Sequence, residues 1–172
     1  MQDKLIIKIK KLHPDSKIPE YAKHGDAGLD LVATSLKMDE YGNAHYGTGL
    51  AFEIPEGYVG LIFPRSSVAK KNQMLTNHVG VVDSGYRGEV SFKFKPTEVY
   101  LDHLRDEKIT FKKKDGLWEE VGETMYAIGD KIGQIIIIPY PKIELQEVNE
   151  LSESERGTGA YGSSDNKPSA TS

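Results

Sequence analysis

The chain has 172 residues, a formal net charge of -4 and no cysteine. This length is enough for one domain with a hydrophobic core, and the negative charge argues against a general nucleic-acid-binding protein, which usually carries a basic face. The lack of cysteine excludes disulfides, thiolate metal sites and a cysteine nucleophile. There is no apolar leader and no apolar run of membrane-spanning length, so we expect a cytoplasmic protein without membrane contact.

Short apolar segments separated by glycine and proline turns follow one another along the chain, with almost no helical periodicity. The predicted strands are Lys4–Lys10, a short strand ending near Ala33, Ala51–Ile54, Tyr58–Phe63, Val79–Val82, Val90–Lys95, Ile132–Ile138 and Ile143–Val148. One short helix is predicted over Ser67–Gln73, with Ser66 as its cap. Many short strands joined by such turns are typical of an all-β barrel or sandwich.

The stretch around Asp83 joins two of these strands. Val79–Val82 is apolar, and a turn that contains Asp83, Ser84 and Gly85 follows it. Apolar and polar residues alternate along Val90–Lys95, so we expect a hairpin whose second strand has one buried face. A carboxylate at the end of an apolar strand is partly desolvated and still reaches a cleft, which suits a general base. An ordinary turn cap is the alternative interpretation of Asp83.

A possible phosphate site follows another predicted strand. Arg65, Ser66 and Ser67 lie where that strand meets the start of the predicted helix. Backbone N–H groups, hydroxyls and a guanidinium together would form a phosphate cradle. A plain helix cap with a surface arginine explains the same residues equally well.

Two acids and one amide are candidates for a metal or ligand site. Asp26 and Asp30 lie four residues apart around a glycine turn, and carboxylate oxygens suit a hydrated Mg²⁺ ion, although most such pairs are simple turn acids. Gln134 lies in the isoleucine run Ile132–Ile138, which we expect to be buried on both faces. An unpaired amide there would cost about 1–3 kcal/mol, so Gln134 needs a protein or ligand partner.

The C-terminal residues 152–172 are rich in serine, glycine, aspartate and asparagine, and we expect them to form a flexible arm beyond a domain of residues 1–151. The arm contains Arg156, Tyr161 and several glycines, a combination that can fold over a ligand with the cation on phosphate and the ring on a base. A glycine-serine linker is the alternative.

Taken in order, five segments resemble the five sequence motifs of the homotrimeric dUTPase family. They are Asp26-Ala-Gly-Leu-Asp30-Leu-Val-Ala33, Pro64-Arg-Ser-Ser-Val-Ala69, Gly80-Val-Val-Asp83-Ser-Gly-Tyr86-Arg-Gly-Glu89, Gly129-Asp-Lys-Ile-Gly-Gln134 and Arg156-Gly-Thr-Gly-Ala-Tyr-Gly-Ser-Ser164. The resemblance implies a jelly-roll-like, distorted β-barrel subunit with one short helix. It also implies a homotrimer with shared active sites, which hydrolyses dUTP to dUMP and pyrophosphate with Mg²⁺ as cofactor.

The resemblance also assigns roles to individual residues. Asp83 would deprotonate the water that attacks the α-phosphorus, and Tyr86 would pack beneath the deoxyribose and exclude a 2′-hydroxyl. Asp30 would anchor waters of the Mg²⁺ ion. From a neighbouring subunit, Arg156 would clamp the terminal phosphate and Tyr161 would stack on the uracil. The remaining substrate contacts would come from Asn77, Gly80 and Val81 at the uracil edge, from Arg65, Ser66, Ser67 and Gln134 at the phosphates, and from Gly162, Ser163 and Ser164 in the arm.

Five positions depart from the usual motifs of the family, and they put nucleotide affinity rather than catalysis in question. Ser67 and Ala160 each stand where glycine is usual or frequent, and Gly85 stands where an acid is common. Tyr161 replaces the usual phenylalanine, and Asp165 replaces a terminal glycine.

The stretch from about Thr97 to Ala127 is longer than the usual connection between the third and fourth motifs. Ile109–Lys113 and Leu117–Val121, on either side of a Lys-Asp-Gly turn, predict an additional β-hairpin, and Asp102–Glu107 predicts a helical turn. Insertions at this place resemble those of dUTPases from phages of Gram-positive bacteria, where the added element contacts a protein partner. A decorated surface loop is an equally good explanation.

Two other functions are consistent with parts of this pattern. A dCTP deaminase shares the fold and the Arg-Ser-Ser segment, but it needs a glutamate on the strand after the third motif, and Lys93 stands at that position. A regulatory protein that has lost catalysis is the second alternative, and the intact Asp83, Tyr86 and Arg156 argue against it.

Overall fold

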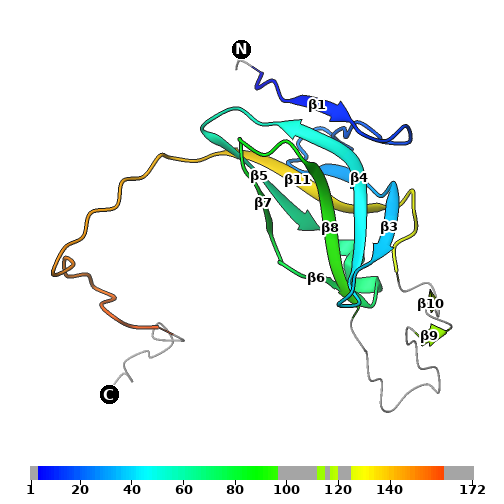
Figure 1. Ribbon diagram of the computed structural model, residues 1–172. Helices are drawn as coiled ribbons and strands as arrows, with labels where there is room; N and C mark the ends of the chain where they lie inside the picture. Colours follow the sequence, from blue (N-terminus) through cyan, green and yellow to red (C-terminus); the bar gives the residue numbers. More distant parts are fainter. Residues whose placement is uncertain (1–3, 97–111, 115–116, 120–124, 161–172) are drawn as a thin grey trace, which may run out of the picture. The chain divides into compact units, whose positions relative to one another are not determined.

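The computed structural model describes residues 4–96, 112–114, 117–119 and 125–160 (Figure 1). By its internal contacts the chain divides into one unit of Met1–Pro141 and a second of Lys142–Ser172. Within the described ranges, no helix is long and apolar enough to cross a membrane.

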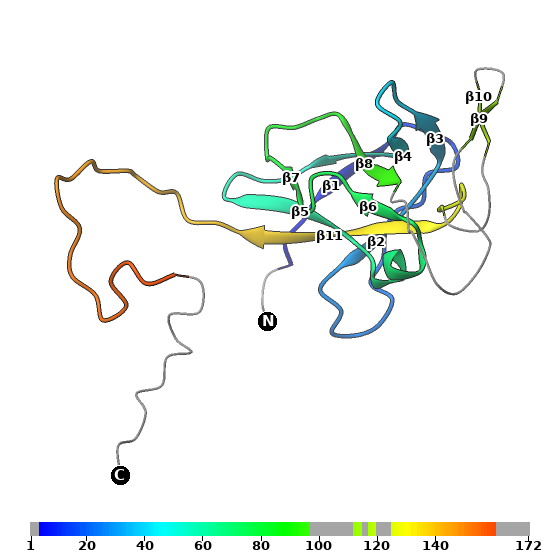
Figure 2. The same cartoon turned by 90° about the horizontal axis from the view of Figure 1, so that it is seen from below.

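Two larger antiparallel sheets make up most of the described part of the first unit (Figures 1 and 2). The first sheet has the order β1–β4–β8–β6, with β3 also paired to β4, and the second has the order β2–β11–β5–β7. The strands of the first sheet are β1 (Lys8–Lys11), β3 (Ser35–Met38), β4 (Ala44–Glu53), β6 (Gln73–Leu75) and β8 (Glu89–Pro96). Those of the second are β2 (Leu29–Val32), β5 (Tyr58–Pro64), β7 (Gly80–Val82) and β11 (Lys131–Pro139). The predicted all-β class is therefore confirmed, and the two sheets are consistent with the predicted jelly-roll-like barrel.

The core lies between the two sheets. Along β8, Val90, Phe92 and Phe94 are buried while the residues between them are more exposed, as their alternation predicts. The Phe92 ring reaches across to the second sheet and packs over Gly133 of β11, where a Cβ atom would overlap the ring. The sheets are thus joined by aromatic rings packed against small residues.

An aromatic cluster connects the segment before β11 to the first sheet. The Tyr126 ring lies 5.6 Å from Phe94 and 6.4 Å from Tyr46, measured between ring centroids. The buried hydroxyl of Tyr46 donates a hydrogen bond of 2.9 Å to the Tyr126 carbonyl oxygen. Met125 and Tyr126 therefore belong to the core, and the insert predicted over residues 97–127 has to end before Met125.

The predicted hairpin around Asp83 is wrong. β7 pairs with β5 of the second sheet, whereas β8 pairs with β4 and β6 of the first. Residues 83–88 therefore cross from one sheet to the other instead of joining two paired strands. Periodicity indicates which face of a strand is buried, but it carries no information about the strand's partner.

Three smaller predictions also need correction. The short helix is a 3-10 helix, η1 (Ser66–Lys70), and Arg65 rather than Ser66 occupies its N-cap without a side-chain cap bond. The isoleucine run of β11 is not buried on both faces, since Ile138 is 38 % exposed. The strand predicted over Ile143–Val148 is absent from the described part of the chain, where that segment has no strand partner.

The additional hairpin predicted between the third and fourth motifs is present in a shorter form. β9 (Lys112–Lys114) and β10 (Leu117–Glu119) pair antiparallel, with Leu117 opposite Lys114. The helical turn predicted over Asp102–Glu107 lies outside the described residues.

The contact of Phe92 with Gly133 provides a test of the sheet packing. We predict that Gly133→Ala lowers the free energy of unfolding by about 1–3 kcal/mol, because the added methyl group displaces the Phe92 ring and lies 2.9 Å from the Phe63 carbonyl oxygen. Gly85→Ala is the matched control, since its Cβ would meet no atom within 4 Å. Urea unfolding of both variants measures the difference, and equal stabilities would contradict this packing.

Candidate active site

Three of the motif segments meet at one end of the second sheet. β11 lies between β2 and β5, and Gln134 stands opposite Asp30 of β2 and Phe63 of β5. Arg65 follows directly after β5, and its Nε forms an ion pair with Asp30 Oδ1 at 2.8 Å. The structure therefore brings together the candidate metal-binding acid, the candidate phosphate-binding arginine and the candidate amide.

The Asp30 carboxylate is the electrostatic centre of this group. Its second oxygen, Oδ2, accepts a hydrogen bond of 2.9 Å from Lys131 Nζ, and the Asp30 side chain is only 16 % exposed. The ion pair with Arg65 involves Nε of the guanidinium. Asp30 thus holds the side chain of Arg65 beside that of Lys131. Sequence analysis missed Lys131, whose position opposite Val32 depends on the pairing of β11 with β2.

Gln134 is half-buried rather than enclosed, because β11 is not covered on both faces. Its side chain lies against Gly28, where a Cβ atom would stand 2.5 Å from Gln134 Oε1. Because Gly28 has no side chain, the Gln134 amide has room to lie beside it, at the end of the second sheet where Asp30 and Arg65 are found. Asp26, in contrast, accepts a hydrogen bond from the Lys23 backbone N–H at 2.8 Å and closes its own turn.

The two serines of the second motif have different environments. Ser66 is exposed, whereas Ser67 is half-buried and its Oγ lies 3.1 Å from the Tyr126 hydroxyl. Lys71 Nζ donates to the Met125 carbonyl oxygen at 2.8 Å and lies 5.5 Å from the centroid of the Tyr126 ring. Tyr126 was missed by sequence analysis because it lies 59 positions after Ser67, inside the stretch assigned to the insert.

The third motif lies at the edge of the second sheet. Asp83 follows β7 and is exposed in the single chain, so its predicted partial desolvation is wrong for one chain alone. Asn77 is exposed in the loop before β7, Gly80 is buried against Ile62, and Val81 is 63 % exposed. The Tyr86 hydroxyl donates a hydrogen bond of 3.0 Å to the Glu89 carbonyl oxygen.

The register of β5 separates Asp83 from Arg65 within one chain. Val82 pairs with Gly60, so Asp83 stands beside Val59 at the start of β5, while Arg65 follows the end of the same strand. Six residues of extended strand correspond to about 20 Å. A base must lie within hydrogen-bond reach of the water that it activates, directly or through one further water. This backbone separation argues that Asp83 and Arg65 of one chain serve different sites.

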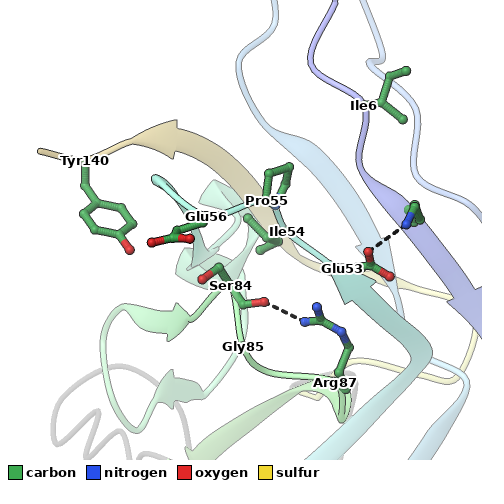
Figure 3. A pocket seen from close by; sticks show the side chains of 10 residues that line it. Ile6, Glu53, Ile54, Pro55, Glu56, Ser84, Gly85, Arg87 and Tyr140 are labelled. Carbon is green, nitrogen blue, oxygen red and sulfur yellow. Dashed lines mark hydrogen bonds and ion pairs between the residues drawn. The ribbon is translucent and has the colours of Figure 1, made fainter. Parts of the chain in front are cut away.

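A depression of about 560 Å³ lies beside the loop that carries Asp83 (Figure 3). β1, the turn between β4 and β5, and the segment Ser84–Arg87 form its walls. The ammonium of Lys8 donates to Glu53 at 2.8 Å and holds the pKa of that carboxyl below its usual value. The Arg87 guanidinium donates to the Ser84 carbonyl oxygen at 2.6 Å and so closes the loop.

In the second unit, Arg156 takes part in a local turn. Its Nε donates to the Gly159 carbonyl oxygen at 2.9 Å, and the Gly157 N–H donates to the Ser154 carbonyl oxygen at 3.0 Å. The other candidate residues of the arm, Tyr161, Gly162, Ser163 and Ser164, lie outside the described residues. No group of three or more histidine, aspartate or glutamate side chains suited to hold a metal occurs in the part of the chain that the structure describes.

Comparison with known proteins identifies the family. A family model described as dUTPase matches residues 15–99. A deoxyuridine 5′-triphosphate nucleotidohydrolase of Clostridium tetani is 37% identical over 161 residues, which cover 91% of this chain and 94% of the relative. One of Rhodococcus erythropolis is 38% identical over 166 residues, which cover 95% of this chain and 88% of the relative.

Solved phage structures are similar as well. Staphylococcus bacteriophage 80alpha dUTPase with dUPNHPP has a TM-score of 0.68 and 30% identity, and the match covers 92% of this chain and 97% of that one. A mutant of the same enzyme, studied for the link between enzymatic activity and SaPI inducing capacity, has a TM-score of 0.70 and 29% identity, with coverage of 95% and 99%. Fold, motif order and relatives agree: this chain belongs to the dUTPase family, and it is a hydrolase.

The Asp30 pairs provide a test of how Arg65 is held. We predict that Asp30→Asn lowers the free energy of unfolding by about 1–2 kcal/mol at low salt, because the half-buried Arg65 and the exposed Lys131 lose the partly buried carboxylate that they share. The loss should shrink in 1 M NaCl, where salt screens the repulsion between Arg65 and Lys131. Urea unfolding at both salt concentrations measures it.

Glu53→Gln is the control for Asp30→Asn. Its ion pair with Lys8 is largely exposed and screened by solvent, so the change should cost much less than Asp30→Asn. A loss as large as that of Asp30→Asn would contradict a special role for the Asp30 pairs.

Proposed function

We propose that this protein hydrolyses dUTP to dUMP and pyrophosphate by in-line attack of water on the α-phosphorus. The observation that carries the proposal is the orientation of Arg65 by Asp30 beside Gln134, at the open end of the second sheet. Phosphoryl chemistry needs mainly positioning and charge neutralisation, which guanidinium, hydroxyl and amide donors supply. Membership of the dUTPase family supports the choice of substrate.

Asp83 acts as the general base in this proposal. Its position after an apolar strand and its exposure in one chain leave the carboxylate accessible to a water molecule. Tyr86 packs beneath the deoxyribose and excludes a 2′-hydroxyl. The outer edge of β7, at Gly80 and Val81, reads the uracil together with Asn77, since β7 is the last strand of its sheet and has β5 on one side only.

The active site is completed by other subunits. The distance of about 20 Å along β5 between Asp83 and Arg65 requires that one nucleotide meets Asp83 of one chain and Arg65 of another. A closed ring of three identical subunits satisfies this requirement at every site, because each chain then supplies both ends of β5 to different neighbours. In this assembly Arg156 clamps the terminal phosphate, Tyr161 stacks on the uracil, and the glycine and hydroxyls of 162–164 close over the phosphates.

A Mg²⁺ ion fits this site only as a hydrated ion. The protein groups available are the Asp30 carboxylate, both of whose oxygens already form ion pairs with cations, and the Gln134 amide on the neighbouring strand. Such donors suit the waters of an ion better than direct coordination by a protein cage. When bound, the ion supplies charge neutralisation on the phosphates, and Asp30 and Gln134 orient its waters.

The first test is pyrophosphate release from dUTP, dTTP, dCTP and UTP with Mg²⁺. We predict release from dUTP far above the other three, and a loss of about 10²- to 10⁴-fold in Asp83→Asn, which removes the base but keeps its shape. Formation of dUTP and ammonia from dCTP, without pyrophosphate, would instead indicate a deaminase. Equal rates for Asp83→Asn and the unaltered protein would rule out Asp83 as the base.

Subunit mixing tests the shared site. Asp83→Asn and Arg65→Ala should each be nearly inactive alone, whereas mixed and reassembled subunits should recover about a quarter of the unaltered rate, since a quarter of randomly formed sites combine two intact halves. Recovery is measured after mild urea treatment and dilution. If the mixture stays as inactive as its components, Asp83 and Arg65 do not serve one site from different chains.

A protein partner for the insert is a second proposal. The antiparallel pair β9–β10 and the similarity to a phage enzyme studied for its SaPI inducing capacity support it. The test is deletion of residues 98–123, which spares Met125 and Tyr126 of the core. If the shortened protein no longer captures the partner but still hydrolyses dUTP, the proposal is supported. If the shortened protein still captures the partner, the proposal is overturned.

A further inference from the structure

A bulge in β4 faces the start of β8. Gly47 pairs with Ser91 and Ala51 pairs with Glu89, so three residues of β4, Thr48–Leu50, stand opposite one residue of β8. Gly49 adopts a positive φ of 64°, a conformation that favours glycine. Such a bulge removes backbone groups from the ladder, and those groups then need other partners.

The Glu89 side chain is the partner of the Gly49 N–H. Its Oε1 accepts this bond at 2.6 Å, and the Gly49 carbonyl oxygen accepts the Leu12 N–H and the Ser16 hydroxyl, each at 2.7 Å. A bond to an ionised acceptor is roughly twice as strong as one between neutral groups. The carboxylate therefore ties the first residue of β8 to the bulge of β4.

The same residue holds Tyr86 through its main chain. The Tyr86 hydroxyl donates to the Glu89 carbonyl oxygen at 3.0 Å, and its ring lies so close to Gly88 that a Cβ atom there would overlap it. Tyr86 is nevertheless 47 % exposed in one chain. The orientation of its ring consequently depends on where the Glu89 carbonyl stands. The Glu89 side chain, bonded to the Gly49 N–H, helps to fix that place together with the pairing of the Glu89 backbone with Ala51.

Resting on the proposed function, we propose that Glu89 is a positioning residue for Tyr86 and thereby controls the discrimination of deoxyribose from ribose. Glu89 does not touch the nucleotide. Its carboxylate anchors the start of β8 at the Gly49 N–H, the anchored carbonyl holds the Tyr86 hydroxyl, and the held ring leaves no space for a 2′-hydroxyl. Without the anchor, the ring moves and UTP is accepted more readily.

The test compares kcat/KM for dUTP and for UTP in Glu89→Ala and Glu89→Gln. Glu89→Ala should lower the dUTP-to-UTP ratio by about tenfold, the factor expected for one lost hydrogen bond. Glu89→Gln keeps an oxygen that accepts the Gly49 N–H, so its ratio should stay within about twofold of the unaltered protein. Glu40→Ala, an exposed glutamate of the β3–β4 turn, is the control for loss of a carboxylate elsewhere.

Two further measurements separate this role from a general loss of structure. Hydrogen exchange of the Gly49 amide should be slow in the unaltered protein and in Glu89→Gln, and faster in Glu89→Ala. Tyr86→Phe removes the hydroxyl alone and should reproduce the loss of selectivity. Combined with Glu89→Ala, it should add little, because both changes break the same connection.

The dUTP-to-UTP ratio of kcat/KM in these variants decides whether Glu89 positions Tyr86. An unchanged ratio in Glu89→Ala overturns it, as does a ratio in Glu89→Gln that falls as far as in Glu89→Ala. If Glu89→Ala does not fold, Tyr86→Phe decides alone, and a ratio equal to that of the unaltered protein overturns the inference. Absence of dUTP hydrolysis in the unaltered protein would instead refute the proposed function itself.

Discussion

The pairing of β7 with β5 is the constraint on which the rest of the site depends. The ladder places Val82 opposite Gly60 and so fixes Asp83 at the start of β5, one strand length from Arg65. Strand geometry makes that backbone separation about 20 Å, which argues against one nucleotide triphosphate contacting both groups of a single chain. The proposed assembly brings the two ends of β5 from different chains to one site, and the exposure of Asp83 and Val81 in one chain agrees with it.

A single acidic residue organises the phosphate end of this arrangement. Asp30 uses one oxygen for Arg65 and the other for Lys131, and the pairing of β2 with β11 places Gln134 opposite it. Three strands that are distant in sequence thus contribute to one small group of charges. Tyr126 links the same end to the core, since its hydroxyl lies 3.1 Å from Ser67 Oγ and its ring packs on Phe94.

The errors of sequence interpretation share one physical origin. The alternation in β8 correctly predicted which side chains are buried, because that depends on the strand's own period of two. The hairpin around Asp83 was wrong, because pairing depends on which surface the strand packs against, and β7 and β8 belong to different sheets. Ile132–Ile138 was taken to be buried on both faces, yet apolar composition alone does not distinguish a covered face from one left open in a single chain.

Strand periodicity, turn residues and donor chemistry are local properties, and they were enough to predict the all-β class, the order of the five motifs and the chemical types of the candidate groups. The packed strands were needed to show that Lys131 shares Asp30 with Arg65, that Tyr126 lies beside Ser67, and that Glu89 joins the β4 bulge to Tyr86. These contacts join residues up to 101 positions apart. They depend on sheet register and on one bulge, which arise from packing between strands and leave no pattern within any single strand.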